Sequence, residues 1–323
     1  MNKFFILFLF CSILYAQDIT SESYCLMNIT DCKIVSHKNA LAPIPPASTV
    51  KLLTAMVVID HNVLEQEFVT SAAAVAVAPT KLGLEKDDKM KCKDLLYALL
   101  LHSANDVAVV IAEGVAGSVS QFAILMNQKA KQIGCNHSNF TTPNGLPDTQ
   151  TRKKVEQYSC AYDLAVIAAN ASRYELIRTI LACPVITLNT SLGKKFTVKS
   201  GNELLFSKPP VYGKTGYTDA SRNTFCGFTK IDSKEYVVSI MKSPKRQVMW
   251  NELRLILGLK NIVCLPKTKQ NIQKLLAEKG YYKGKIDGRP GPKTIEAIKK
   301  FQQDHNLEVD GLVGPATWQL LNQ

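Results

Sequence analysis

Three short groups of polar residues follow one another along this 323-residue chain, and their side chains could together carry out acyl transfer. They are the pair Ser48 and Lys51, the pair Ser103 and Asn105, and the run Lys214, Thr215 and Gly216. A serine enzyme that forms an acyl intermediate needs a nucleophile, a base, a proton relay to the leaving group, and donors for the developing oxyanion. Each task has a candidate among these residues.

The first pair lies in the segment PPASTVKL, where a serine and a lysine three positions apart would share one helix face. The S-x-x-K pattern alone is weak, since it recurs at Ser191 and Lys194, and prolines followed by Ser-Thr are also an ordinary helix start. The helix predicted over 48–60 is apolar almost all round, which is typical of a helix inside a domain. A buried Lys51 needs partners or a lowered pKa, and a lysine with a lowered pKa could accept the proton of Ser48.

The second and third groups each have a simpler explanation when taken singly. Ser103 and Asn105 in HSAND could form only a helix cap, and the glycine-flanked Lys214 and Thr215 could form only a turn. A second S-x-N even occurs at 200–202. The order of the three groups, with the first at the start of a buried helix, favours a common site. The glycines around Lys214 would also let another backbone pair with this segment as an added strand.

The elements that must position these residues follow from hydrophobic periodicity. Two short strands are predicted within 23–39, and helices over 48–60, 92–101, 107–117, 120–134 and 159–171, with a turn over 141–148. After residue 210 the hydrophobic pattern becomes alternating, which predicts strands over 211–218, 222–231 and 234–241. A helix is predicted over 248–258. The pattern predicts an α/β domain in which a helical cluster is backed by an antiparallel sheet.

The two ends of the chain differ from this central part. Residues 1–16, MNKFFILFLFCSILYA, have the outline of a signal peptide, so we expect an exported protein of the periplasm or cell envelope with a first domain over 17–260. After a linker over 261–268, the segment DGRPGPKT at 287–294 returns as DGLVGPAT at 310–317. The repeat predicts a small helical module over 269–323. Nothing after the signal peptide approaches the roughly 20 apolar residues of a membrane span.

The cysteines and the net charge say less about function than the motifs do. Eight cysteines remain after the signal peptide, and both disulfides and buried free thiols stay open. With no C-x-x-C pair and no His/Cys cluster in the sequence, we predict neither a metal nor a cofactor. The formal net charge of +12 favours an anionic partner, and we expect cell-wall polymer rather than nucleic acid.

The ordered S-x-x-K, S-x-N and K-T-G groups resemble the penicillin-interacting serine enzymes. The segments PPASTVKLLTA, LLYALLLHSANDVAVVIAE, TTPNGLPD and YGKTGYT narrow the resemblance to the D-alanyl-D-alanine carboxypeptidases, the low-molecular-mass penicillin-binding proteins, over roughly residues 20–260. The resemblance implies a serine transpeptidase/β-lactamase-like fold and release of the terminal D-alanine from peptidoglycan stem peptides, with β-lactams as inhibitors. The family continues after K-T-G with Ala-Gly where this chain has DASRNTFCGFTK, so differences are expected at the far end of the cleft.

The resemblance also assigns roles. Ser48 would form the acyl enzyme with Lys51 as base, while Ser103 and Asn105 would relay the proton and position the substrate. The third motif, Lys214, Thr215 and Gly216, would bind the substrate. Lys214 and Thr215 would bind the terminal carboxylate of the substrate. Backbone N–H groups of Ser48 and Tyr217 would form the oxyanion hole.

The module over 269–323 resembles small three-helix peptidoglycan-binding domains, including their GYY and paired DG..G..T signatures. It would bind cell-wall polymer. Tyr281 and Tyr282 are expected to pack in its core rather than to form a sugar platform, because buried aromatic residues usually serve packing.

Three other functions remain open. An endopeptidase that cuts D-alanyl cross-links would use the same residues. A β-lactamase shares the three motifs, but the Glu-x-x-Leu-Asn segment of class A enzymes does not occur between Asn105 and Lys214. A catalytically inert wall-binding protein would have no need for the complete set of reactive residues.

Overall fold

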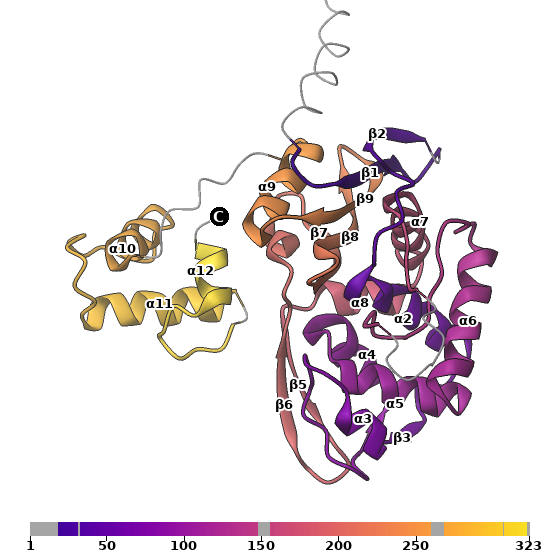
Figure 1. Ribbon diagram of the computed structural model, residues 1–323. Coiled ribbons are helices and arrows are strands. Elements are labelled where there is room, and N and C mark those ends of the chain that lie inside the picture. Colours follow the sequence, from indigo (N-terminus) through magenta and orange to yellow (C-terminus); the bar gives the residue numbers. More distant parts are fainter. Residues whose placement is uncertain (1–18, 32, 148–155, 260–267, 306, 322–323) are drawn as a thin grey trace, which may run out of the picture. The chain divides into compact units, whose positions relative to one another are not determined.

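The computed structural model describes residues 19–31, 33–147, 156–259, 268–305 and 307–321 (Figure 1). Contacts divide the chain into two units, one up to residue 205 together with 209–259, the other formed by 206–208 and 260–323. The predicted signal peptide and nearly all of the predicted linker lie outside the described residues. The domain boundaries therefore stay a prediction.

The first unit contains a five-stranded antiparallel sheet with the strand order β2-β1-β9-β8-β7. Its strands are β1 (Ser23–Asn28), β2 (Ile34–Lys38), β7 (Val211–Thr218), β8 (Arg222–Ile231) and β9 (Lys234–Ser243). The predicted strands are present, and β7, which carries the K-T-G run, lies at one edge of the sheet.

Helices cover both faces of this sheet. Cys25 and Met27 of β1 belong to the same apolar core as α7 (Ala161–Ala171), whereas their neighbours Tyr24 and Leu26 pack with α9 (Arg246–Ile256). Successive side chains of a strand point to opposite faces, so both faces of β1 are buried. The sheet is the middle layer between α7 and α9.

The helical cluster surrounds α2 (Lys51–Asp60), which is buried along most of its length because apolar residues occupy nearly every position. The other elements of the cluster are α3 (Ala72–Ala76), α4 (Cys92–Tyr97), α5 (Asn105–Ala116), α6 (Val119–Gln132) and α8 (Glu175–Ala182), with the short pair β3 (Glu67–Val69) and β4 (Lys89–Lys91). Within the described ranges, no single helix has the length and hydropathy of a membrane span; α5 and α6 meet that criterion only as a pair bent by 84°.

The sequence analysis did not predict α3, α8 or the pair β3 and β4, and three further features differ from its predictions. The helix predicted over 48–60 begins with a 3-10 turn, Ala47–Val50, before α2. The segment predicted as one helix over 92–101 consists of α4, which ends at Tyr97, followed by a π-helical turn, Ala98–His102. A hairpin of β5 (Val185–Asn189) and β6 (Lys195–Lys199), which the sequence reading missed, runs beside the helical cluster and is followed by a short 3-10 helix, Glu203–Phe206 (Figure 1).

The second unit contains α10 (Lys269–Glu278), α11 (Pro292–Asp304) and α12 (Pro315–Leu321). Two buried glutamines explain its sequence repeat. The amide of Gln273 donates to Asp287 Oδ1 and Thr294 Oγ1 of the first copy, at 3.1 and 3.3 Å. Gln302 makes the same contacts in the second copy, and each glutamine oxygen accepts a backbone N–H of its DG turn. The repeat therefore preserves two loops that are each held by one glutamine.

The two tyrosines of this unit pack as predicted. Tyr282 is buried in the core, and Tyr281 meets the ring of Phe301 edge to face at 5.2 Å. These rings contribute to a core that contains no cysteine among its residues.

Candidate active site

The turn that carries Ser48 is held in place by two close backbone approaches. A Cβ atom on Gly145 would lie 1.9 Å from the carbonyl oxygen of Ala47, and one on Gly216 would lie 2.9 Å from Ser48 N. Any side chain at these glycines would therefore collide with the turn. Ala47 itself has a positive φ of 47°, which is unusual for a residue other than glycine. Neither this turn nor α2 has a side-chain cap, so the simple capping role of Ser48 is wrong.

Ser48 is instead joined to Lys51. The Lys51 amine lies 2.7 Å from Ser48 Oγ, 2.8 Å from Asn105 Oδ1 and 2.8 Å from the carbonyl oxygen of Asn144. Lys51 is fully buried. Its only described partners are therefore the nucleophile candidate, one side-chain amide and one backbone carbonyl.

This environment lowers the pKa of Lys51 well below its ordinary value. Burial is the largest cause, because the ammonium loses hydration, and the nearby positive charge of Lys214 lowers it further. The negative charge of Asp106 acts in the opposite direction without reversing the shift. A lowered pKa is one of the two outcomes that the sequence analysis allowed for a buried Lys51, and burial is its main cause.

The second motif reaches this site through an irregular break between helices. The π turn ends at Ser103, which adopts the left-handed conformation with φ 64° and ψ 28°, and α5 begins at Asn105. Asn105 Nδ2 donates to the carbonyl oxygen of Ala78 at 3.1 Å. This bond fixes the orientation of the amide, so that its oxygen faces Lys51.

The third motif lies on β7 at the sheet edge. Lys214 is opposite Cys226 of β8 and is buried, and its amine donates to the carbonyl oxygen of Thr215 at 2.9 Å. Burial lowers the pKa of Lys214 to about 7, Arg246 lowers it as a second cation, and Cys226 acts in the raising direction. Because burial also raises the pKa of the Cys226 thiol to about 12, that thiol is uncharged near neutral pH.

A cleft of about 440 Å³ brings the motifs together. Ser48 and Ser103 lie on its lining, whereas Lys51 and Asn105 are buried behind Ser48. The rest of the predicted site also lines the cleft: Lys214, Thr215, Gly216 and Tyr217. The structure thus gathers all eight residues, while their individual roles remain predictions.

Cleft residues that the sequence reading missed are mainly polar or basic. Arg246 donates to the carbonyl oxygen of Gly201 at 2.6 Å, and its guanidinium lies 5.8 Å from the Trp250 ring centre. Lys199 of β6 is a third cation at the cleft, with Lys214 and Arg246. The Asn144 carbonyl was also missed, although it lies in the TTPNGLPD turn that the sequence had singled out.

The far end of the cleft has its own hairpin. Ser221 N donates to Thr218 Oγ1 at 3.0 Å, and the hydroxyls of these residues contact each other. Tyr217 OH donates to Asp219 Oδ1 at 3.1 Å, and Asn223 lines the cleft. Residues 219–221 therefore form a polar turn between β7 and β8, and Arg222 and Asn223 begin β8.

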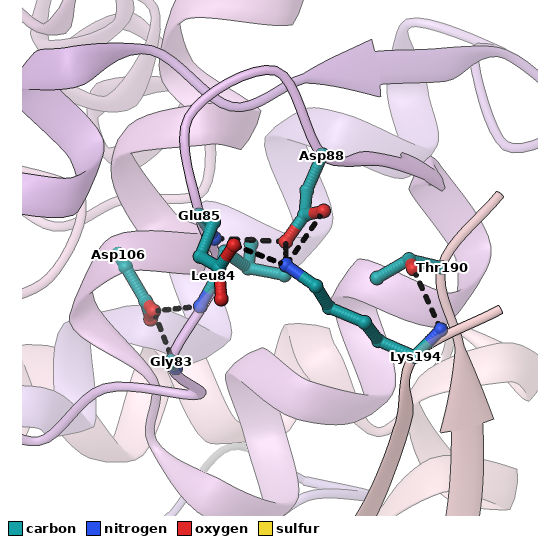
Figure 2. A network of polar contacts seen from close by, with 7 residues as sticks. All are labelled: Gly83, Leu84, Glu85, Asp88, Asp106, Thr190 and Lys194. Carbon is teal, nitrogen blue, oxygen red and sulfur yellow. Dashed lines mark hydrogen bonds and ion pairs between the residues drawn. The ribbon is translucent and has the colours of Figure 1, made fainter. Parts of the chain in front are cut away.

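The second S-x-x-K pair lies elsewhere, in the turn between β5 and β6. Figure 2 shows Lys194 directed toward two carboxylates, Glu85 Oε2 at 2.8 Å and Asp88 Oδ2 at 3.1 Å. The hydrogen bond with Glu85 is the first cause of a raised pKa for Lys194. Lys194 is thus a stable cation that is unsuited to accept a proton from Ser191.

A separate set of hydrogen bonds, made by Asp106, holds one wall of the cleft. The buried carboxylate of Asp106 accepts the N–H of Leu82 at 2.9 Å. It also accepts the N–H groups of Gly83 at 2.9 Å and of Leu84 at 3.3 Å (Figure 2). Pro79 and Thr80, just before this loop, line the cleft. Asp106 therefore ties the start of α5 to the segment that faces Ser103.

Comparisons with known proteins identify the families to which the two parts of the chain are similar. The model of the D-alanyl-D-alanine carboxypeptidase family matches residues 12–245, and that of a putative peptidoglycan binding domain matches residues 269–321. The D-alanyl-D-alanine carboxypeptidase DacF of Bacillus subtilis is 30% identical over 59% of this chain, and the match spans 49% of its own length. DacB2 of Mycobacterium tuberculosis is 29% identical over 69% of this chain and 75% of its own.

Solved structures show the same similarity. A D-alanyl-D-alanine carboxypeptidase from Mycobacterium tuberculosis superposes with a TM-score of 0.68 and 26% identity, covering 74% of this chain and 89% of that one. The Streptomyces K15 DD-transpeptidase has a TM-score of 0.68 at 24% identity, covering 74% of this chain and 96% of its own, which shows a shared fold. The predicted serine transpeptidase/β-lactamase-like fold is confirmed.

Proposed function

This chain belongs to the D-alanyl-D-alanine carboxypeptidase family, and we propose from that premise that it is a serine hydrolase that removes the terminal D-alanine from peptidoglycan stem peptides. The observation that carries the proposal is the 2.7 Å contact between the buried Lys51 amine and Ser48 Oγ. This contact joins a nucleophile to a base whose pKa is lowered, at the wall of an open cleft.

The partners of Lys51 favour its action as a base. Asn105 Oδ1 and the Asn144 carbonyl are both acceptors, so they take the two N–H groups of a neutral amine. Its lone pair is then left for the third partner, the hydroxyl of Ser48. The arrangement orients a neutral lysine toward the proton that it must remove.

The proposed reaction has two halves. Ser48 Oγ attacks the carbonyl carbon between the two D-alanines as Lys51 takes its proton, and the carbonyl electron pair moves onto oxygen. When this pair returns, the C–N bond breaks and the leaving amine of D-alanine receives the proton held by Lys51, with Ser103 as relay. Water then attacks the ester and restores Ser48. Backbone N–H groups of Ser48 and Tyr217 would stabilise the oxyanion in both halves.

The other end of the cleft suits the substrate carboxylate. Lys214 and Thr215 would bind it, and the peptide would align with the edge strand β7. Arg246 adds a planar cation that is suited to a carboxylate. A peptide that ends in a free D-alanine would place its scissile carbonyl at Ser48 once its carboxylate is held there.

β-Lactams are proposed to acylate the same serine. Attack of Ser48 on the lactam carbonyl opens the ring, and the nitrogen stays attached to the acyl group. The resulting ester would keep the cleft blocked. The absence of Glu-x-x-Leu-Asn between the second and third motifs supports slow hydrolysis of this ester rather than β-lactamase activity.

A second candidate is an endopeptidase that cuts D-alanyl cross-links, because an Escherichia coli protein named D-alanyl-D-alanine endopeptidase is 27% identical over 69% of this chain and 72% of its own. The test is to supply purified muropeptides, both monomers and cross-linked dimers. A carboxypeptidase releases free D-alanine from pentapeptide monomers. Conversion of dimers without release of D-alanine would instead favour the endopeptidase.

The proposed location follows from the remaining parts of the chain. The peptidoglycan-binding match at 269–321 supports attachment to cell-wall polymer, and residues 1–16 support export to the periplasm or cell envelope. The linker at 261–268 would let the module act as a tether for the catalytic domain. No cofactor is needed for the proposed steps.

A further inference from the structure

Three side chains that commonly bind metals meet at the start of α7, apart from the residues that line the cleft. A ring nitrogen of His137, the sulfur of Cys160 and a carboxylate oxygen of Asp163 all lie within 4.8 Å of one another. Cys160 is the N-cap of α7 and Asp163 lies in its first turn, whereas His137 follows α6. The ligands come from separate segments of the sequence, which is why no sequence pattern indicated them.

Only one of the two carboxylate oxygens of Asp163 has hydrogen-bond partners among the described residues. Asp163 is fully buried, and its Oδ2 accepts bonds from His137 N and Ser138 Oγ, both at 2.7 Å. Its Oδ1 has no hydrogen-bond partner in the part of the chain that the structure describes. His137 Nδ1 lies 3.8 Å from Oδ1, which is too far for a hydrogen bond. A buried carboxylate oxygen without a partner is costly, so this atom points to a missing cation.

The sulfur of Cys160 is available as a second ligand. Cys160 is fully buried and is one of six described cysteines, all of them free. Its sulfur accepts the N–H of Asp163 at 3.4 Å, a capping contact that serine would make equally well. Burial raises the pKa of this thiol to about 11, so a bound metal would be needed to displace its proton near neutral pH.

We propose that His137, Cys160 and Asp163 bind one borderline-soft divalent cation of the Zn²⁺ class, with water as the fourth ligand. Sulfur, imidazole nitrogen and carboxylate oxygen are the ligands that Zn²⁺ takes, at about 2.0–2.3 Å each, so three such atoms within 4.8 Å of one another need to move inward only slightly. The Cys160 thiol gives its proton to solvent as the sulfur–metal bond forms. The His137 side chain, 49% exposed, provides a path from solvent.

The site would clamp the segment after α6 onto the start of α7. The neighbouring residue Ser159 pairs its N–H with the carbonyl oxygen of Ile44 at 3.0 Å, shortly before the turn that carries Ser48. A cation bound only in the folded state raises the melting temperature. The role proposed for it is structural and does not depend on the proposed peptidase activity.

The test uses full-length protein, reduced and freed of metal with a chelator, and titrated with Co²⁺ as a spectroscopic substitute for Zn²⁺. One Co²⁺ per chain should produce tetrahedral visible bands and a thiolate-to-cobalt band in the ultraviolet, and Zn²⁺ should displace it. Cys160→Ser, which keeps the helix cap, should abolish the ultraviolet band. His137→Ala should weaken binding by more than the roughly 10–100-fold seen for outer-shell changes.

Matched controls are Cys183→Ser and His37→Ala, which change the same residue types away from the cluster and should bind Co²⁺ as the wild type does. Zn²⁺ should raise the melting temperature of the wild type and of both controls but not that of Cys160→Ser. Absence of the thiolate band in the wild type, equal binding by the His137 variant, or a disulfide at Cys160 in the purified protein would each overturn the proposed site.

Discussion

At the scale of single residues, the proposed site contains two buried lysines with different surroundings. Lys51 has its amine at 2.7 Å from Ser48 Oγ and two acceptors beside it, whereas Lys214 lines the cleft where the substrate carboxylate is proposed to bind. Both have lowered pKa values, chiefly because burial removes the hydration of their ammonium groups. Their proposed roles lead to different predictions.

We expect Lys51→Ala to stop acylation, since Lys51 is the amine that is hydrogen-bonded to Ser48 Oγ. The rate of D-alanine release should fall by at least about 10³-fold, in line with the loss of one member of a catalytic unit. Lys194→Ala, at the second S-x-x-K, is the matched control and should keep the rate within a few-fold. If the Lys51 variant were acylated at the wild-type rate, Lys51 could not be the base.

The pKa of Lys214, about 7, predicts an alkaline limb in the pH dependence of kcat/KM. Below this pH Lys214 is cationic and attracts the substrate carboxylate; above it the free enzyme loses the charge, and KM rises. Lys51 has the opposite requirement, since it must be neutral to act as base, so its titration sets the acid limb. The measurement is kcat/KM against pH for a D-alanyl-D-alanine peptide.

Two comparisons, one between variants and one between substrates, test whether the alkaline limb is due to Lys214. Lys214→Arg keeps its charge over the whole range and should shift the alkaline limb upward, whereas Lys195→Arg, an exposed lysine of β6, should leave it in place. A substrate with a C-terminal amide should be slow at every pH and show no alkaline limb. An amide substrate with the same limb as the acid would rule out carboxylate binding by Lys214.

At the scale of elements, the cleft wall before α5 depends on one buried carboxylate. Asp106→Ala would leave the N–H groups of Leu82, Gly83 and Leu84 without their acceptor, at a cost of about 1–3 kcal/mol in the free energy of unfolding. D-alanine release should also fall, because Thr80, which pairs with Asn105 N at 2.7 Å, lies beside this loop.

Urea denaturation and D-alanine release measure the two effects. Asp87→Ala is the control from the same loop, since the Asp87 side chain is exposed and forms a 4.0 Å ion pair with Lys86, of a kind worth less than about 1 kcal/mol. Equal stability of the Asp106 and Asp87 variants would contradict the account of this wall.

Much of this site could be predicted from the sequence because its chemistry resides in side chains. Ser48 and Lys51 are three positions apart on one helix turn, so their proximity follows from local geometry. The Asn144 carbonyl could not be predicted in the same way, since every residue has one. The π turn before Ser103 was missed because its apolar sequence, ALLLH, also fits an α-helix.

The proposed metal site was missed for a different reason. His137 precedes α7 by a long segment, and the antiparallel bridge between Asn139 and Tyr158, with the hydrogen bonds of Ser138, brings it beside Cys160. Local spacing does not reveal such a contact. The hairpin of β5 and β6 has mostly exposed or half-buried residues, which weakens the alternation that indicates a strand.

At the scale of the whole molecule, the chain combines a catalytic unit with a module that has its own core. Leu276, Ile298 and Phe301 are buried within the module, and Gln273 and Gln302 hold its two loops. An independent module on a linker would raise the local concentration of an insoluble substrate without changing the chemistry of acylation.

Truncation before Lys269 should therefore leave hydrolysis of a soluble D-alanyl-D-alanine peptide unchanged and reduce cosedimentation with purified cell wall. Both assays need the same salt concentration, because a basic catalytic domain can bind anionic polymers nonspecifically. Unchanged cosedimentation would refute the tether. Loss of activity on the soluble peptide would show that the module supports the catalytic fold instead.

The most direct test of the central claim is the intact mass of the full-length protein after incubation with a penicillin, followed by peptide mapping of the adduct. The geometry predicts one acyl group per chain, attached to Ser48, because only this serine contacts a buried lysine of lowered pKa in the described residues. Ser191→Ala should be labelled as the wild type is, and Ser48→Ala should gain no mass. An adduct that persists in the Ser48 variant, or maps to Ser191, would contradict the account.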